Sequence, residues 1–243
     1  MLRIIHSYYL RTKRMPIRLL LILLPLAYSL VFITYLRTST GFSGIETFAF
    51  RAIFSILSLF SASFFVDMVY ESDKNAQAYA NDLRVGISRK KLFLGRFLFI
   101  LILFFLIELI SGLIFFLYLR LSQTAFDNKN FFLMFLINFL GIMPSLVLYQ
   151  YMNLKYEYTG SLSLAGFLSL ASILLGTSGL GNIIWKFFPF TYPIKLIFLL
   201  AKGLAKESQM YKYLTISTLV CIILLWIFSI WFKNWDGQSR MEE

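Results

Sequence analysis

Cysteine, histidine and charged residues are all scarce in this chain of 243 residues, and each shortage excludes a class of protein. The single cysteine, Cys221, cannot form a disulfide within the chain, and the single histidine, His6, cannot build a metal site, which needs several clustered ligands. Charged residues make up 14% of the chain and hydrophobic residues 59%, whereas soluble domains are about a quarter charged and about half apolar. Since a soluble surface needs more charge than this, the composition predicts an integral membrane protein.

The sequence also lacks the residues of a membrane-embedded enzyme. A metalloprotease needs clustered His and Glu, and a serine enzyme needs a base within a span, and neither arrangement is present. The chain contains no Gly-x-x-x-x-Gly-Lys-Ser/Thr motif and therefore no P-loop for ATP. We expect no catalytic residue, no metal and no cofactor on this chain.

A net charge of +11 is the other strong feature of the composition. The basic residues lie between apolar runs and not on a soluble basic face, so nucleic acid is not an expected partner. Membrane lipids with anionic headgroups are the expected partner.

Six apolar runs are long enough for transmembrane helices, which need about 20 residues each. The runs are continuously apolar, without the alternation of barrel strands, so we expect an all-α integral membrane protein. The first run is too long for a signal peptide and lacks a small-residue cleavage site, which favours a retained helix. The predicted spans cover residues 19–36, 48–70, 97–119, 131–154, 161–184 and 213–232 of a single transmembrane domain, residues 1–243.

Two further segments are predicted not to span the membrane. Residues 1–14 place apolar and basic side chains on different helical faces, which favours an interfacial helix over a disordered basic tail. Residues 187–201 are apolar but short, and they contain Pro189, Pro193 and Lys195. Because each proline removes a backbone donor, we expect a re-entrant or interfacial segment before the last span.

The distribution of Lys and Arg predicts the orientation. With six spans, 14 of these residues fall on the side of the two termini and 9 on the other side. The positive-inside rule therefore places both termini in the cytoplasm. Residues 186–212, which carry five of the nine opposing charges, are the weakest part of this topology.

The long cytoplasmic loop between the second and third predicted spans has the pattern of a short helix. Ala76, Tyr79, Ala80 and Leu83 share one helical face, Ser72 or Asp73 can cap its start, and Gly86 suits its end. Such a helix either docks into a groove on a soluble partner or packs on its own membrane domain.

The same loop resembles that of type-2 ATP-binding cassette exporter permeases. The resemblance lies in ESDK at residues 71–74 and GISRKKLFLGR at residues 86–96, with Arg96 where the family commonly has lysine. The order of six spans, the basic N-terminal helix and the proline-bearing segment before the last span are also similar. In sequence the resemblance is specific over about 25 residues, and the chain is similar in size to permeases for lantibiotic or bacteriocin immunity and peptide export.

The resemblance implies a bacterial cytoplasmic membrane protein that pairs with a separate ATPase subunit carrying ATP and Mg. It implies a second permease copy or a related chain, and an amphipathic substrate such as an antimicrobial peptide, toxin or lipid-like drug. The alternatives are an ATP-independent channel or carrier and an immunity protein that binds a toxin directly. The residues implied to dock the ATPase, as a coupling helix, are Asp73, Ala76, Tyr79, Ala80, Leu83 and Arg84.

Two sets of residues within the spans are further candidates. Glu108 lies in the middle of the third span, where an ionisable group usually faces protein or water. It is expected either to contact substrate, together with Asn138, or to be a neutral carboxyl hydrogen-bonded to a neighbour such as Asn138. The small residues Ala165, Ser169, Ser172 and Gly176 form a stripe that packs either within the chain or at a permease dimer.

Overall fold

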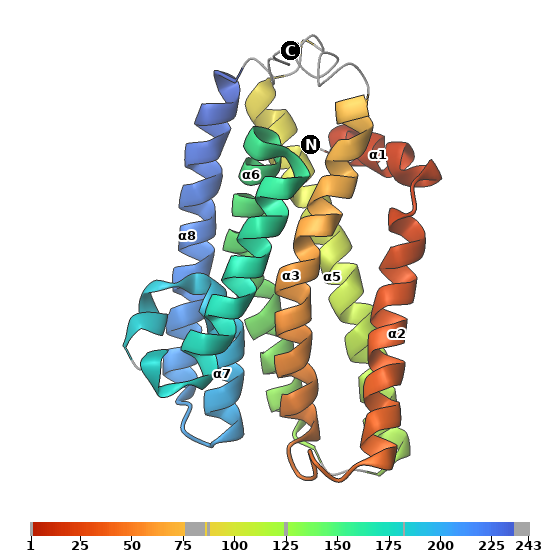
Figure 1. Cartoon of the computed structure of the whole chain (residues 1–243), viewed down its shortest axis with the longest axis vertical. Coiled ribbons are helices and arrows are strands. Elements are labelled where there is room, and N and C mark those ends of the chain that lie inside the picture. Colours follow the sequence, from red (N-terminus) through yellow and green to blue (C-terminus); the bar gives the residue numbers. More distant parts are fainter. Residues whose placement is uncertain (1, 76–85, 87, 124–125, 182, 236–243) are drawn as a thin grey trace.

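The computed structural model describes residues 2–75, 86, 88–123, 126–181 and 183–235, and every regular element in these residues is helical. Five helices are long and apolar enough to cross a membrane, which indicates a multi-pass membrane protein (Figure 1). They are α2 (Ile17–Thr38), α3 (Glu46–Asn75), α5 (Arg89–Leu121), α6 (Asn128–Thr177) and α8 (Glu207–Lys233). The shorter elements are α1 (Leu2–Arg11), α7 (Tyr192–Ala201) and the 3-10 turns η1 (Thr12–Arg14), η2 (Gly179–Gly181), η3 (Ile184–Phe187) and η4 (Pro189–Thr191).

Helix α6 consists of two helical arms, and the chain folds back on itself between them. Its backbone leaves the helical region at Tyr156 and at Glu157, which has φ 57° and ψ −162°. On either side of this break, Gly141 and Gly176 both lie against the start of α7. Since 35 residues of straight helix would separate them by about 52 Å, the two arms must run antiparallel, as Figure 1 shows.

The long helices confirm the apolar runs as helices but move their ends. Helices α2, α3, α5 and α8 cover the predicted spans 19–36, 48–70, 97–119 and 213–232 and extend beyond them. The first arm of α6 covers residues 131–154. The second arm ends at Thr177, where Ser178 takes up extended backbone, so the predicted span 161–184 is too long at its end.

The N-terminal segment is a helix and not a disordered tail. Helix α1 packs on α5, where Gly95 allows a close approach: a Cβ at this glycine would lie 2.6 Å from Cγ2 of Ile4. Only a residue without a side chain can stand at such a crossing. Gly95 therefore permits α1 to pack closely on α5.

The first six residues of α7 lie inside the bundle, so this part of the predicted segment 187–201 is not interfacial, whereas the re-entrant alternative is not contradicted. Residues 192–197 are all buried, between the two arms of α6 and beside α3, so α7 does not lie on a surface. Its 10 residues extend about 15 Å, half the thickness of a bilayer core. Helix α7 is thus too short to span, as expected; residues 192–197 are enclosed by protein, whereas Phe187 at the start of the predicted segment is 76% exposed.

The bundle has two ends that differ in their contacts. At the first, called the Asp73 end, Lys74 pairs with Glu157 at 2.5 Å, and Arg89 donates to the carbonyl of Lys233 at 3.1 Å. Helix α1 also lies at this end (Figure 1). At the other, called the Arg120 end, the Arg120 guanidinium donates to Asn128 at 3.0 Å.

Candidate functional site

Three elements meet on one carboxylate at the Asp73 end. Asp73, in the last turn of α3, is 4% exposed and accepts a hydrogen bond from Nη2 of Arg96 on α5 at 2.6 Å. Its other oxygen pairs with Arg11 of α1. The fully buried guanidinium of Arg96 lies 4.6 Å from the ring centre of Tyr70 and 5.4 Å from that of Tyr8. These five residues are called the Asp73 cluster.

The chemistry of the residues explains why this cluster forms. A buried guanidinium is tolerated only where a carboxylate and further polar or aromatic groups replace its water. Arg96 receives Asp73 and two ring faces, which attract cations. Burial raises the pKa of the Tyr8 phenol, so this ring stays neutral beside the ion pairs at pH 7.

The Asp73 cluster revises one part of the predicted coupling helix. Helix α3 continues to Asn75, so Asp73 lies within its last turn. The Asp73 side chain faces Arg96 and is not presented to a soluble partner. The other predicted docking residues, Ala76, Tyr79, Ala80, Leu83 and Arg84, lie outside the described residues.

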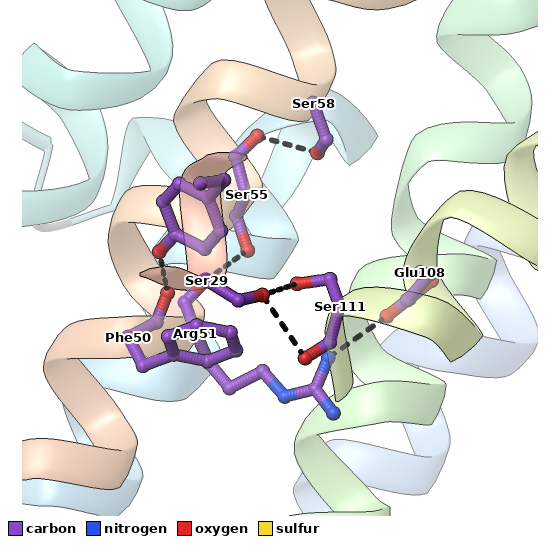
Figure 2. A network of polar contacts seen from close by, with 8 residues as sticks. Ser29, Phe50, Arg51, Ser55, Ser58, Glu108 and Ser111 are labelled. Carbon is purple, nitrogen blue, oxygen red and sulfur yellow. Dashed lines mark hydrogen bonds and ion pairs between the residues drawn. The ribbon is translucent and has the colours of Figure 1, made fainter. Parts of the chain in front are cut away.

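A second charged group lies inside the bundle. Arg51 of α3, Glu108 of α5 and Asn138 of α6 are all fully buried, and they are called the Arg51 cluster. The distance between Nη1 of Arg51 and Oε1 of Glu108 is 3.6 Å (Figure 2). Gly112 makes room for the guanidinium, because a Cβ there would lie 2.9 Å from Nη2 of Arg51.

Serine side chains continue the polar contacts around this ion pair. Ser29 of α2 donates to the carbonyl of Ser111 on α5 at 3.3 Å, and Ser55 donates to the carbonyl of Arg51 at 2.8 Å (Figure 2). Polar contacts thus reach from α2 across α5 to α3 within an otherwise apolar bundle. Hydroxyls that bond backbone carbonyls in this way are compatible with an apolar surrounding.

The polar side-chain atoms of the Arg51 cluster are close together but do not form hydrogen bonds with one another. A separation of 3.6 Å between Arg51 and Glu108 is an ion pair but too long for a hydrogen bond. Asn138 lies beside Glu108, yet its amide, both carboxylate oxygens and the three guanidinium nitrogens reach no hydrogen-bond geometry with any described residue. Buried polar groups in folded proteins are usually satisfied, so this cluster is a candidate for contact with another molecule.

Sequence reasoning identified Glu108 and Asn138 but not Arg51 as a member of the same site. The signal was present, since Arg51 lies in the apolar run of the second predicted span. A basic residue in one span and an acidic residue in another are expected to pair, because each is costly alone in the membrane.

The small-residue stripe of α6 packs within the chain. Ala165, Ser169, Ser172 and Gly176 are buried, and Ser172 donates to the carbonyl of Phe190 at 3.0 Å. A Cβ at Gly176 would lie 2.9 Å from Ile194 of α7. Of the two interpretations of the stripe, the structure therefore favours packing inside one protomer over a permease-dimer contact.

Comparison with protein-family models, with curated proteins and with solved structures gives no match. Within the described ranges, no three His, Cys, Asp or Glu residues are close enough to hold a metal ion. The two charged clusters are therefore the candidate functional sites of the described residues.

Proposed function

We propose that this chain is the permease subunit of an ATP-driven exporter and that a separate ATPase docks at the Asp73 end. The observation that carries the proposal is the Asp73 cluster, which ties α1, α3 and α5 together beside the segment of residues 76–85. That segment connects α3 to α5 and bears the apolar face predicted to dock. Because the chain has no P-loop, the ATPase must be another polypeptide.

The Asp73 cluster is suited to transmit movement of the docking segment, residues 76–85, to the membrane helices. A docking segment can move the membrane helices only if the helices at both its ends are attached firmly to each other. The hydrogen bond of 2.6 Å between Asp73 and Arg96 makes this attachment between α3 and α5, and Arg11 adds α1. A displacement of the segment would therefore move these three helices as one body.

The arrangement of the helices supports a chain that crosses the membrane six times. Helices α2, α3, α5 and α8 each supply one crossing, and the antiparallel arms of α6 supply two. With this topology the Asp73 end carries the larger share of Lys and Arg and faces the cytoplasm. A second permease, as another copy or a related chain, completes the transporter in the bacterial cytoplasmic membrane, and the substrate is an amphipathic peptide, toxin or lipid-like drug.

An ATP-independent channel or carrier is the second candidate, and one observation favours it. The Arg51 cluster places two charged residues and an amide inside the bundle, and such groups often mark ion or substrate pathways. In a carrier these groups would be the centre of transport, and the segment of residues 76–85 would have no partner.

Purification of the affinity-tagged full chain from its native membranes tests the proposal. We expect an ATPase with a P-loop to co-purify with the wild-type chain and to be lost with Leu83→Asp. Burying one apolar side chain contributes about 1.5–3 kcal/mol, so losing Leu83 weakens docking by about tenfold or more. A buried charge weakens it further.

Arg120→Asp is the control for this experiment, because it introduces the same charge at the opposite end of the bundle. It should retain the ATPase at the wild-type ratio to permease. Full retention of the ATPase by a Tyr79→Asp, Leu83→Asp double variant would contradict the docking assignment, and the carrier would become the better proposal.

A further inference from the structure

A small polar pocket lies at the Arg120 end, where the loop of residues 39–45 joins α2 to α3 (Figure 1). It has a volume of about 130 Å³, and polar atoms make up most of its surface. The residues that line it are Leu36, Ser39, Thr40, Ser43, Glu46, Tyr118 and Leu119. The pocket therefore offers an occupant several hydroxyl groups and one carboxylate.

Glu46, in the first turn of α3, is half-buried and only partly occupied. Its Oε1 accepts a hydrogen bond from the backbone N–H of Gly44 at 3.0 Å. Gly44 has φ 81°, a conformation that glycine adopts readily, so the turn can direct this N–H at the carboxylate. Among the described residues, the other oxygen of Glu46 accepts no hydrogen bond and meets no cation. A carboxylate held on one side and open on the other is suited to bind a cationic donor.

A positive charge lies beside the same pocket. The Arg37 guanidinium is 6.0 Å from the ring centre of Tyr118, which forms one wall. Arg37 is exposed and forms no ion pair with any residue that the structure describes. A ligand with only a positive charge would be repelled by Arg37, and a ligand with only a negative charge would be repelled by Glu46. The two charges together favour a zwitterion.

An apolar groove of about 690 Å³ between α2 and α3 begins at the same loop. It ends at Tyr35 and Phe42, which are next in the chain to Leu36 and Ser43 of the pocket. From Tyr35 its lining follows α2 to Leu24, about 16 Å along the helix. The groove thus lies along the first predicted span, at the depth of acyl chains, whereas the pocket lies between the predicted spans 19–36 and 48–70, at the depth of headgroups.

We propose that the pocket and the groove together bind one phospholipid whose zwitterionic headgroup ends in a primary ammonium. The ammonium donates hydrogen bonds to the open oxygen of Glu46 and to the loop hydroxyls, the phosphate lies toward Arg37, and one acyl chain lies in the groove. A choline headgroup has the same charges but is bulkier and has no N–H to donate. Binding goes beyond the proposed transport function and requires neither the ATPase nor turnover.

Native mass spectrometry of the full chain tests this site. The delipidated protein is titrated with phosphatidylethanolamine, phosphatidylcholine and phosphatidylglycerol that carry identical acyl chains, and the apparent Kd of the first bound lipid is measured for each. We expect phosphatidylethanolamine to bind about tenfold more tightly than phosphatidylcholine, because a hydrogen bond to a charged group contributes about one factor of ten.

Glu46→Gln keeps the shape of the side chain and removes its charge, so it should bring the Kd values for these two lipids close together. Glu207→Gln is the matched control, because Glu207 is an exposed carboxylate at the same end that pairs with Lys129 outside the pocket. It should keep the tenfold preference. Ala27→Trp fills the groove from an exposed position and should weaken both lipids alike while the preference remains.

Four outcomes would overturn the proposal. Equal binding of the ethanolamine and choline lipids by the wild-type chain would show that the pocket does not read the ammonium. An unchanged preference in Glu46→Gln would place the ammonium elsewhere. Tightest binding of phosphatidylglycerol would indicate an anionic lipid site, and displacement of phosphatidylethanolamine by an equal concentration of free ethanolamine would indicate a soluble amine.

Discussion

Removing the charge of Asp73 should cost far more stability than removing Arg11, its more exposed partner. Asp73→Asn keeps the shape of the side chain but leaves the guanidinium of Arg96, which is fully buried, without its carboxylate. Breaking a buried ion pair from one side costs about 3–5 kcal/mol. Arg11→Ala should lower the free energy of unfolding by only about 0–1 kcal/mol, because the Arg11 side chain is 37% exposed.

The difference is large enough to measure as a shift of the unfolding temperature. For a chain of this size each kcal/mol corresponds to about 2–4 °C, so Asp73→Asn should lower the midpoint by about 6–20 °C. Arg11→Ala should lower it by no more than about 4 °C. The assay is thermal unfolding in detergent, followed by the loss of the monodisperse peak in size-exclusion chromatography.

A double variant separates the charge effect from loss of packing. Asp73→Leu combined with Arg96→Met replaces the buried pair by apolar side chains and should recover most of the loss, because no uncompensated charge remains. If Asp73→Asn and Arg11→Ala produced equal, small shifts, the buried pair would not hold α3 to α5, and the mechanical argument for the docking segment would lose its support.

Two further predictions concern the break in α6 and the topology. Glu157→Gly should stabilise the chain by about 1–2 kcal/mol, because glycine adopts φ 57° with ψ −162° without strain. The surface ion pair with Lys74, which is lost with the carboxylate, contributes less than this to stability. If Glu157→Gly unfolded at a lower temperature than Glu157→Ala, the backbone at this position would not be strained. Since Cys221 is buried, single cysteines report topology cleanly, and an impermeant thiol reagent should label Ser39→Cys in intact cells but Ser88→Cys only after permeabilisation. Labelling of Ser88→Cys from outside would reverse the orientation and remove the ATPase from the Asp73 end.

The helices themselves follow from the sequence because the bilayer constrains them locally. A run of about 20 apolar residues in a membrane must satisfy its backbone polar groups internally, which only a helix achieves within one segment. The apolar runs therefore predicted α2, α3, α5, α8 and both arms of α6. The end of the second arm at Thr177 was missed because residues 178–184 carry no charge, although Ser178, Gly179 and Gly181 are residues that commonly follow the end of a helix.

In the candidate sites, too, some residues could be predicted from the sequence and others depend on how the helices pack. Glu108 could be identified because a charge in an apolar run is costly wherever it lies. Its partner Arg51 is 57 residues away in the chain, so the pair depends on how α3 packs against α5. The resemblance of the loop implied that Asp73 is a docking residue, whereas the packing of α5 brings Arg96 to it.

The sequence by itself determined that this chain is helical and apolar enough for the membrane, and which short segments cannot span it, because length, hydropathy and proline act within one segment. Only the tertiary structure decided which faces meet: that the small residues of α6 receive α7 and Phe190, that Gly112 makes room for Arg51, and that Asp73 joins α1 to α5. These contacts join residues far apart in the chain, and a pattern of residue types along one helix does not specify its neighbour.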